Sequence, residues 1–403
     1  MSEVATVRAV PRADRRDPAA DVVATVERLL PAIRDGAGRR DADRVLPRRE
    51  LTLLSQSGVL AATVPTAWGG PGGGAVEAAE ATRLLATVDP NVAQAPQSHF
   101  VYLRLVHLAG SDALRSRLFT DVVAGERVAN AQSERHGATV AEITTRVRDA
   151  DGRVLLSGEK FYATGSVLAD WLAVLARDEA GDEVVAFVRR DAAGVVVHDD
   201  WDALGQRTTA SGTVELRDVV VEPGHLVPRA DAVRGPHGYG AFAQLLHAAI
   251  DVGIARGALT DAATFVRERS RPWPDAGVER AEDDPLLVQR FGRLEVEVRA
   301  AEAALLVAAE RVDRTSAHGT DESAAEASLA VAAAKVLADR AALEVTTAAF
   351  ELGGTRSAVR DGDHDRHWRN ARTHTLHDPV RWKVQHLGRW AVSGTPPPRT
   401  PQL

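Results

Sequence analysis

A sequence pattern typical of β-strands, set between regions of helical periodicity, includes the stretch Ile143-Thr144-Thr145-Arg146-Val147-Arg148-Asp149-Ala150-Asp151-Gly152-Arg153-Val154-Leu155-Leu156-Ser157. Its two ends, residues 143–147 and 154–157, flank the dipeptide Asp151-Gly152. Asp-Gly between two such runs is typical of a two-residue hairpin turn, so the stretch predicts two strands. Sequence with helical periodicity precedes and follows this region.

Further strand signals follow the hairpin. Residues 171–175 and 184–188 flank a Gly181-Asp182 turn, and residues 195–197 and 214–221 are rich in valine. We therefore expect a small antiparallel β domain over residues 128–233.

Apolar residues recur at helical spacing on both sides of this β domain. Residues 17–127 are expected to form an N-terminal helical domain, after a flexible tail over residues 1–16. Apolar stripes cover residues 248–266, 287–308 and 329–350, and Pro379 is placed to begin a further helix that ends near residue 390. Residues 234–394 are therefore expected to form an antiparallel four-helix bundle, followed by a tail over residues 395–403.

Local features refine this expectation. Gly253 and Gly257 would let one long helix approach a neighbour closely, and Ser323 with Glu326 matches a capping box. The Gly-rich loop over residues 69–74 precedes a helix that begins near Ala75. A phosphate cradle is one interpretation of this loop, but no strand precedes it and the lysine of a P-loop is missing, so a plain loop is the preferred one.

Composition excludes several classes of function. The chain has 403 residues, enough for a large core in one to three domains. Its net charge of −7 argues against non-specific nucleic-acid binding, which needs a basic surface. The absence of cysteine excludes disulfides, thiolate zinc sites and cysteine nucleophiles. No apolar run reaches the roughly 18 residues of a membrane helix, so we expect a soluble cytoplasmic protein without a membrane partner.

Titratable side chains are concentrated in the segment His367-Trp368-Arg369-Asn370-Ala371-Arg372-Thr373-His374-Thr375-Leu376-His377-Asp378-Pro379. Three histidines, two arginines and a carboxylate at this density fit a site that handles protons and a bound anion. Histidines also suggest zinc, but the chain has no HExxH motif and no cysteine pair, so we expect no metal.

The order of helices, small β domain and helical bundle resembles the acyl-CoA dehydrogenase superfamily over residues 17–394. The stretch Gly158–Ser166 resembles the superfamily's Gly-x-Lys-x-x-x-Thr strand beside the flavin, and Trp201–Arg207 with Ser211-Gly212 resembles the turn over the flavin ring. Asn130–Glu134 lies where such proteins enter the β domain. The resemblance implies a mostly α fold with an N-terminal helical domain, a middle antiparallel β-barrel and a C-terminal four-helix bundle.

Two departures argue against FAD-dependent desaturation. Typical acyl-CoA dehydrogenases carry Tyr-Glu-Gly, with Glu as the base, where this chain has His377-Asp378-Pro379. Aspartate is one methylene shorter, and a misplacement of ~1 Å costs about a hundredfold in rate; the following proline also forces extended geometry. Phe350 stands where the superfamily has a glutamine that contacts the second half of FAD, and its side chain cannot form that hydrogen bond.

The same segments resemble another branch, the FMN-dependent dibenzothiophene monooxygenases and the sulfur-acquisition oxidoreductases. The resemblance rests on residues 369–379, 270–273 and 199–201 and on His99, and residues 244–255 are most similar to the sulfur-acquisition group. It implies a two-component monooxygenase that takes reduced FMN from a separate NAD(P)H-dependent flavin reductase. Together with molecular oxygen, the flavin would form a C4a-(hydro)peroxide that oxygenates a small organosulfur compound. A homodimer or homotetramer is implied, because part of the site in this family comes from a second subunit.

The expected site residues follow from this resemblance and from their chemistry. Histidine has a reference pKa of about 6.5 and exchanges protons near neutral pH, so His377 is the expected acid–base residue, with His99 and His374 beside it. The edge of the flavin is expected to contact three polar side chains, those of Asn130, Thr164 and Ser211. Its ring is expected to lie against two aromatic side chains, those of Tyr162 and Trp201. Guanidinium suits bidentate phosphate binding, and the FMN phosphate is assigned to Arg269, Arg271 and Arg356.

Two other functions stay open. One is an acyl-CoA dehydrogenase that binds FAD in place of FMN and uses Asp378 as an unusual base. The other is a non-catalytic flavin-binding protein of the same fold, although the density of matching polar residues argues against it. Within the monooxygenase interpretation, oxygenation of nitrogen instead of sulfur is also open.

Overall fold

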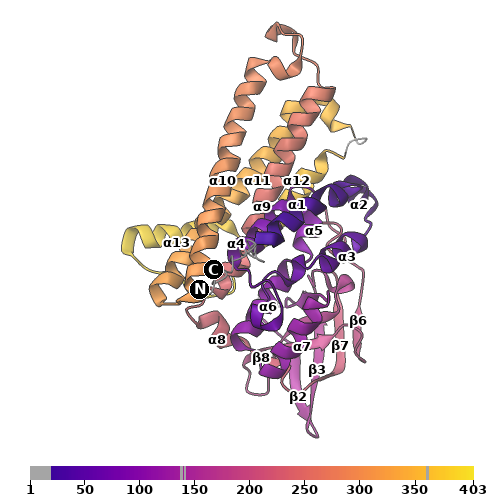
Figure 1. Cartoon of the computed structure of the whole chain (residues 1–403), viewed down its shortest axis with the longest axis vertical. Coiled ribbons are helices and arrows are strands. Elements are labelled where there is room, and N and C mark those ends of the chain that lie inside the picture. Colours follow the sequence, from indigo (N-terminus) through magenta and orange to yellow (C-terminus); the bar gives the residue numbers. More distant parts are fainter. Residues whose placement is uncertain (1–19, 137–138, 140–141, 360–362) are drawn as a thin grey trace, which may run out of the picture.

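The fold, seen in a computed structural model, has three parts in chain order, and the structure describes residues 20–136, 139, 142–359 and 363–403 (Figure 1). The predicted tail over residues 1–16 lies outside these residues. The first part is helical and comprises α1 (Ala20–Arg34), α2 (Ala37–Asp43), α3 (Arg48–Gln56), α4 (Ala75–Ala86), α5 (Pro90–Gln94), α6 (Gln97–Ala109) and α7 (Asp112–Val123).

The second part is a mixed sheet, with eight strands over the described residues. They are β1 (Val128–Ala131), β2 (Arg146–Ala150), β3 (Arg153–Lys160), β4 (Trp171–Arg177), β5 (Glu183–Arg189), β6 (Val195–Val197), β7 (Val214–Val221) and β8 (Leu226–Pro228). The strand order is β6-β7-β3-β2-β4-β5-β8, with β1 paired to β4. The predicted hairpin is confirmed, because Ala150 pairs with Arg153 across a turn in which Asp151 and Gly152 have φ of 55° and 79°.

The expectation of a purely antiparallel sheet is wrong at two pairings. β1 runs parallel to β4, and β2 meets β4 in parallel at Arg146 and Arg177. The carbonyl of Arg127 accepts the N–H groups of Asp170 and Trp171, so β1 and β4 begin together and run the same way. Among the described strands no pairing joins β6 to β8 at the two ends of the sheet order, so the expected barrel is not confirmed.

The third part is built on long helices. It comprises α8 (Arg229–Arg234), α9 (Tyr239–Arg269), α10 (Pro285–Ala317), α11 (Asp321–Gly353), α12 (Asp365–His374) and α13 (Val380–Ser393). The helices α9, α10 and α11 pack on one another and contain the three predicted apolar stripes. Helix α13 contacts α11 but crosses the lower part of the long helices (Figure 1), so the expected four-helix arrangement is not confirmed.

The cap of α11 differs from its prediction. Thr320 is the N-cap residue, and its hydroxyl accepts the N–H of Ser323 over 3.1 Å. The hydroxyl of Ser323 accepts the N–H of Thr320 over 2.9 Å. The predicted box of Ser323 and Glu326 is therefore wrong by three residues, because serine here takes the return bond usually made by glutamate.

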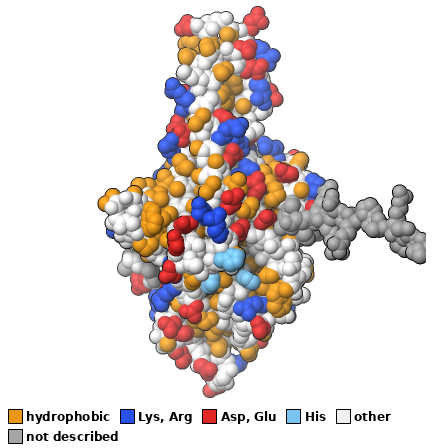
Figure 2. All heavy atoms as spheres, turned by 60° about the vertical axis from the view of Figure 1, so that its left-hand side comes forward, with side chains coloured by type: hydrophobic (Ala, Val, Ile, Leu, Met, Phe, Trp, Pro, Cys, Tyr) orange, Lys and Arg blue, Asp and Glu red, His pale blue; other side chains and the backbone are white. Residues whose placement is uncertain are grey.

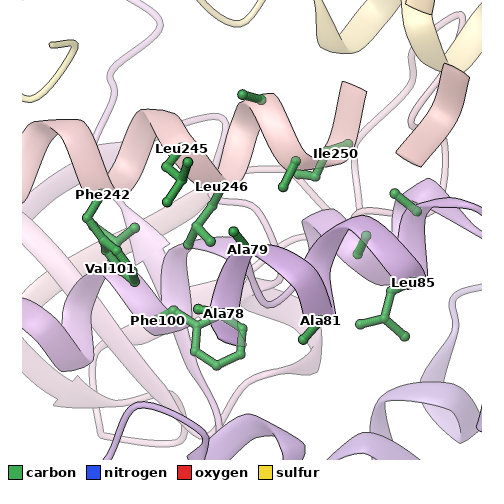
Figure 3. Packing of buried hydrophobic residues seen from close by; sticks show 14 of the residues in the cluster. Ala78, Ala79, Ala81, Leu85, Phe100, Val101, Phe242, Leu245, Leu246 and Ile250 are labelled. Atoms are coloured by element: carbon green, nitrogen blue, oxygen red, sulfur yellow. The ribbon is translucent and has the colours of Figure 1, made fainter. Parts of the chain in front are cut away.

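The interface between α4 and α9 connects the first and third parts of the fold. Figure 3 shows Leu246 and Ile250 of α9 facing alanines of α4. A Cβ on Gly253 would lie 2.4 Å from the carbonyl oxygen of Arg83, and one on Gly257 would lie 2.3 Å from that of Thr87. The close approach predicted for the two glycines is therefore confirmed.

The loop over residues 69–74 leads into α4, whose N-terminus already has an anionic partner. The carboxylate of Asp313, on α10, accepts the N–H groups of Ala75 and Val76 over 2.6 Å and 3.1 Å. A helix N-terminus favours a negative group, and Asp313 supplies it from within the protein. The plain-loop interpretation fits this arrangement better than the phosphate cradle. None of the described helices has the length and apolarity of a bilayer-spanning segment.

Candidate functional site

The turn between β6 and β7 is fixed against α12. A Cβ on Gly205 would lie 1.9 Å from the carbonyl oxygen of Arg369, so only glycine permits this approach. The N–H of Gln206 donates to Oδ1 of Asn370 over 2.6 Å. Asn370 and His374 are four residues apart on α12 and share one face of it. The turn is thereby held beside the helix face that carries a predicted catalytic histidine.

An aromatic corner adjoins the same turn. The rings of Tyr162 and Trp201 meet edge to face with their centroids 5.9 Å apart, and the Trp201 indole N–H donates to the carbonyl of Gln206 over 2.8 Å. Tyr162 is 53% exposed and has a φ of 57°. A bulky residue in this left-handed region is strained, and such strain concentrates at functional sites. The structure brings the two predicted aromatic residues together and leaves Tyr162 exposed at the surface.

Buried polar groups lie on the adjoining strands and turn. The hydroxyls of Thr164 and Ser211 are 2.8 Å apart, and Ser211 is 2.8 Å from the hydroxyl of Thr209. The amide oxygen of Asn130, on β1, is buried without a hydrogen-bond partner among the described residues. Buried polar atoms are normally bonded, so this oxygen is an acceptor available to a ligand that donates a hydrogen bond.

Three histidines meet where α12 ends beside α9. Nδ1 of His247 lies 3.1 Å from Nε2 of His374. The ring of His377 stacks on that of His247, with centroids 3.7 Å apart and planes inclined by 29°. The side chain of His377 is 44% exposed, whereas the other two rings are buried. Figure 2 shows histidine side chains gathered on one face of the molecule, below the long helices.

Charged side chains are buried behind these rings. Asp251 of α9 lies 2.6 Å from Nδ1 of His374 through one oxygen and 2.6 Å from Nζ of Lys335 through the other. Lys335, on α11, also donates to Asp339. Both Asp251 and Lys335 are fully buried. A buried charge needs a partner, and here each charged group has at least one.

Burial and mutual charge set the pKa values in this cluster. Burial opposes the ionisation of Asp251, but His374 and Lys335 outweigh it and hold the pKa of Asp251 well below its usual range. Burial together with the charge of Asp251 raises the pKa of Asp339 to about 8. Burial lowers the pKa of both His374 and His247. At neutral pH the cluster therefore combines charged Asp251 and Lys335 with two neutral imidazoles.

Asp378, the base of the alternative function, is stabilised as a carboxylate. Its oxygen lies 2.7 Å from Nζ of Lys383, and the residue is buried. Burial opposes ionisation, but the hydrogen bond from His377 and the charges of Lys383 and Lys335 hold the pKa of Asp378 well below its usual range. Such a carboxylate is a weak base and is poorly suited to remove a proton from carbon.

His99 lies apart from the histidine cluster. On α6 it is fully buried, with Nε2 2.8 Å from the carbonyl oxygen of Leu60, while Nδ1 accepts the N–H of Val128 over 3.0 Å. Burial lowers the pKa of His99 to about 4, despite the opposing bond to Leu60. Both ring nitrogens thus serve the backbone, and neither is free for the proton transfer that we expected of this residue.

The three arginines expected at the phosphate lie at the other end of the long helices. Arg356 donates to the carbonyl of Arg269, the last residue of α9, and Arg271 follows two residues later. Arg269 and His247 are about 33 Å apart along α9, at about 1.5 Å per residue. This separation is longer than an FMN molecule. Within one chain the structure therefore brings Arg269 and Arg356 together, but away from the histidine cluster.

Comparison with known proteins agrees with this geometry. The acyl-CoA dehydrogenase N-terminal, middle and C-terminal domain models match residues 20–126, 130–219 and 245–382. The dibenzothiophene monooxygenase of Rhodococcus qingshengii is 31% identical, over 94% of this chain and 94% of that protein. The chain belongs to the dibenzothiophene monooxygenase family.

Other members of the family extend the comparison. The probable FMNH2-dependent monooxygenase SfnC of Pseudomonas putida is 30% identical, over 94% of this chain and 97% of that protein. The crystal structure of FMN-bound TdsC from Paenibacillus sp. A11-2 is similar with a TM-score of 0.90 and 32% identity, and covers 95% of this chain and 100% of that one. Monooxygenases of this family therefore share the whole fold of this chain, including the site regions.

Residues that we did not predict complete the histidine cluster of this family member. They are His247, Asp251, Lys335 and Asp339. His247 and Asp251 are four residues apart on one predicted helix, and Lys335 and Asp339 are four residues apart on another, so each pair shares a helix face. That spacing was the available signal. Within the described residues no group of three or more His, Asp or Glu is arranged to hold a metal ion.

Proposed function

We propose that this protein is a two-component monooxygenase that uses reduced FMN and molecular oxygen to oxygenate a small organosulfur compound. An NAD(P)H-dependent flavin reductase would supply the reduced FMN. The observation that carries the proposal is the histidine cluster, whose exposed member His377 immediately precedes Asp378, the residue at the position of the catalytic glutamate of acyl-CoA dehydrogenases. The named activities of the dibenzothiophene monooxygenase and of SfnC support this reaction class.

The residues of the aromatic corner and its neighbours fit a flavin. The unpartnered oxygen of Asn130 accepts a hydrogen bond, and the hydroxyls of Thr164 and Ser211 can each donate or accept one. These are complementary to the alternating donors and acceptors along the edge of a flavin ring. Tyr162 and Trp201 offer apolar ring surface beside them. When bound, reduced FMN supplies the electrons that activate oxygen.

His377 is proposed to hold and deliver the proton that oxygen activation requires. It is the one ring of the cluster that is both exposed and close to a buried carboxylate, with Nδ1 3.5 Å from Asp378. Exposure gives it access to substrate, and stacking on His247 fixes its ring plane. The two buried rings lack that access.

The position of the arginines supports a site shared between subunits. Arg269 lies about 33 Å along α9 from His247, and Arg356 donates to the carbonyl of Arg269. We therefore propose that these two arginines and Arg271 bind the phosphate of an FMN held by a neighbouring copy. A homodimer or homotetramer would then be needed for activity. The closed β-barrel, the four-helix bundle and a cytoplasmic location stay predictions within this proposal.

Subunit mixing tests the shared site. His377→Phe and Arg356→Ala are each expected to be inactive alone. In randomly mixed dimers half of the molecules are hybrids. If the site is shared, one site of each hybrid contains both substitutions and the other contains neither, so about a quarter of the wild-type activity returns. No return of activity would place Arg356 and His377 in the same site of one subunit, against the proposal.

The main test is a coupled assay with purified protein, a flavin reductase, NADH, FMN and dibenzothiophene alongside small sulfones. We expect an oxygenated product with the wild type and with His386→Phe, a control that removes an imidazole from α13. His377→Phe should lose at least about a hundredfold of turnover, the usual contribution of general acid–base catalysis. Full turnover by His377→Phe would remove this residue from the mechanism.

Two alternatives give different results. An acyl-CoA dehydrogenase would have its flavin reduced anaerobically by an acyl-CoA, a reaction for which Asp378 is a poor base. A non-catalytic protein would bind flavin and form no product with any substrate. Oxygenation of an amine in place of a sulfur compound would keep the reaction class and change the substrate.

A further inference from the structure

His247 has defined neighbours on both the edge and the face of its ring, and its own protonation and tautomer have no part in the reaction as proposed so far. Its Nδ1 lies 3.1 Å from Nε2 of His374, and its face carries the ring of His377 at 3.7 Å between centroids. His247 itself is 5% exposed. A buried imidazole with this many contacts is rigid, so its protonation and tautomer are set by its partners.

The contacts determine which nitrogen of each ring carries a hydrogen. Asp251 is bonded to the ammonium of Lys335 and is a carboxylate that only accepts, so Nδ1 of His374 carries a hydrogen. A neutral His374 then has Nε2 as its acceptor. Nδ1 of His247 must donate to that acceptor. Both buried rings are therefore Nδ1–H tautomers.

Burial and the positive charges of two lysines favour a neutral His247, and carboxylates lie among the same surrounding elements. Lys335 and Asp339 face it from α11, Lys383 lies on α13, and Asp378 lies in the connection between α12 and α13. Burial lowers the pKa of His247 well below its usual range, and the charges of Lys335 and Lys383 act in the same direction. His247 is therefore the neutral member of the stacked pair.

We propose that Asp251 and His374 are positioning residues that hold His247 as a neutral Nδ1–H ring, on which His377 is stacked and oriented for proton transfer. Stacked rings do not direct an N–H at each other, so no proton passes from His377 into the buried rings. The chain from Asp251 to His247 fixes geometry and charge. The inference rests on the proposed function only for the reaction that His377 serves.

The first test reads the tautomers without flavin, oxygen or substrate. Full-length protein is labelled with nitrogen-15 histidine, and the signals of His247 and His374 are identified by their loss in His247→Phe and His374→Gln. We expect both rings to show the Nδ1–H pattern and to remain neutral from about pH 8 to about pH 6, below the ordinary pKa of histidine. An Nε2–H pattern for His247, or protonation of either ring within that range, would overturn the proposal.

The second test compares two replacements of His374. Leucine removes the donor and the acceptor, whereas the amide of glutamine carries one of each at a spacing close to that of the ring nitrogens. We expect His374→Leu to lower kcat by about tenfold or more, the usual range for a residue that orients a catalytic group. KM for reduced FMN should change less than about twofold, and His374→Gln should recover most of kcat. The control His386→Gln should match the wild type.

The outcomes separate this inference from the proposed function. If the wild type forms no oxygenated product but the tautomers are as expected, the proposed function fails and the positioning arrangement stands. If the wild type is active and His374→Leu keeps its kcat and its pH profile, the positioning role is refuted. Should His374→Leu not fold, the spectra of the wild type and the kcat of His374→Gln decide the question, since both are defined in folded protein.

Discussion

Replacing Lys335 with methionine tests the buried charges on which the histidine cluster depends. The ammonium of Lys335 is fully buried and contacts both Asp251 and Asp339. Removing one partner of a buried ion pair costs about 3–5 kcal/mol, because the remaining charge is left without compensation. We expect Lys335→Met to lose this amount of the free energy of unfolding at pH 8, measured by urea denaturation.

The pH dependence of this loss has a definite sign. Without the ammonium, the buried carboxylate of Asp251 favours its protonated form, so its folded-state pKa rises above that of the unfolded chain, whereas the pKa of Asp339 is already raised in the wild type. The variant then gains stability relative to the wild type as pH falls from 8 towards 5. Arg311→Gln is the control, because its bond to Glu326 also attaches α11 to a neighbouring long helix, here α10, but lies on the surface and is worth about 0–1 kcal/mol. A loss in Lys335→Met no larger than in this control would refute the reasoning.

Three further predictions concern other parts of the site. The folded protein keeps His99 neutral down to about pH 4, whereas the unfolded chain binds a proton there below about pH 6.5, so the wild type loses about 1.4 kcal/mol of stability for each pH unit of acidification between these values. In urea denaturation at pH 6 and pH 5, His99→Gln should lack this dependence on pH. An unchanged dependence would contradict the buried neutral ring. Gly205→Ala should weaken FMN binding by at least about tenfold, or about 1.4 kcal/mol in calorimetry, because the Cβ would displace the turn from α12. The control is Gly292→Ala, whose Cβ meets nothing within 4 Å. Equal affinities of the two variants for FMN would show that the turn does not shape the flavin site. Asn130→Ala should weaken FMN binding by about 1 kcal/mol, the worth of one hydrogen bond, and unaltered affinity would leave its buried oxygen without a ligand.

Local signals predicted much of the fold. The hairpin at Asp151-Gly152 follows from two adjacent residues whose backbone angles decide the turn. The long helices follow from apolar periodicity within each segment. The parallel pairing of β1 with β4 could not be predicted in this way, because it depends on where Arg127 meets Trp171 in the folded chain. Periodicity carries no information on which elements become neighbours.

The candidate site shows the same division. His374 and His377 were found because they lie in one segment dense in titratable groups. His247, Asp251 and Lys335 were missed because each lies in a helix that is otherwise apolar, where a single polar residue is usually a packing residue. Only the packing of α9 against α11 and α12 reveals that they share one network.

The measurement that tests the central claim most directly is the source of the oxygen in the product. The protein is incubated with a flavin reductase, NADH, FMN and dibenzothiophene under oxygen-18 gas, and the product is analysed by mass spectrometry. A reduced-FMN monooxygenase places oxygen-18 from the gas on sulfur, and the label is absent with His377→Phe. Product oxygen that comes only from water would contradict the account, as would oxidation of an acyl-CoA under anaerobic conditions with no turnover of any sulfur compound.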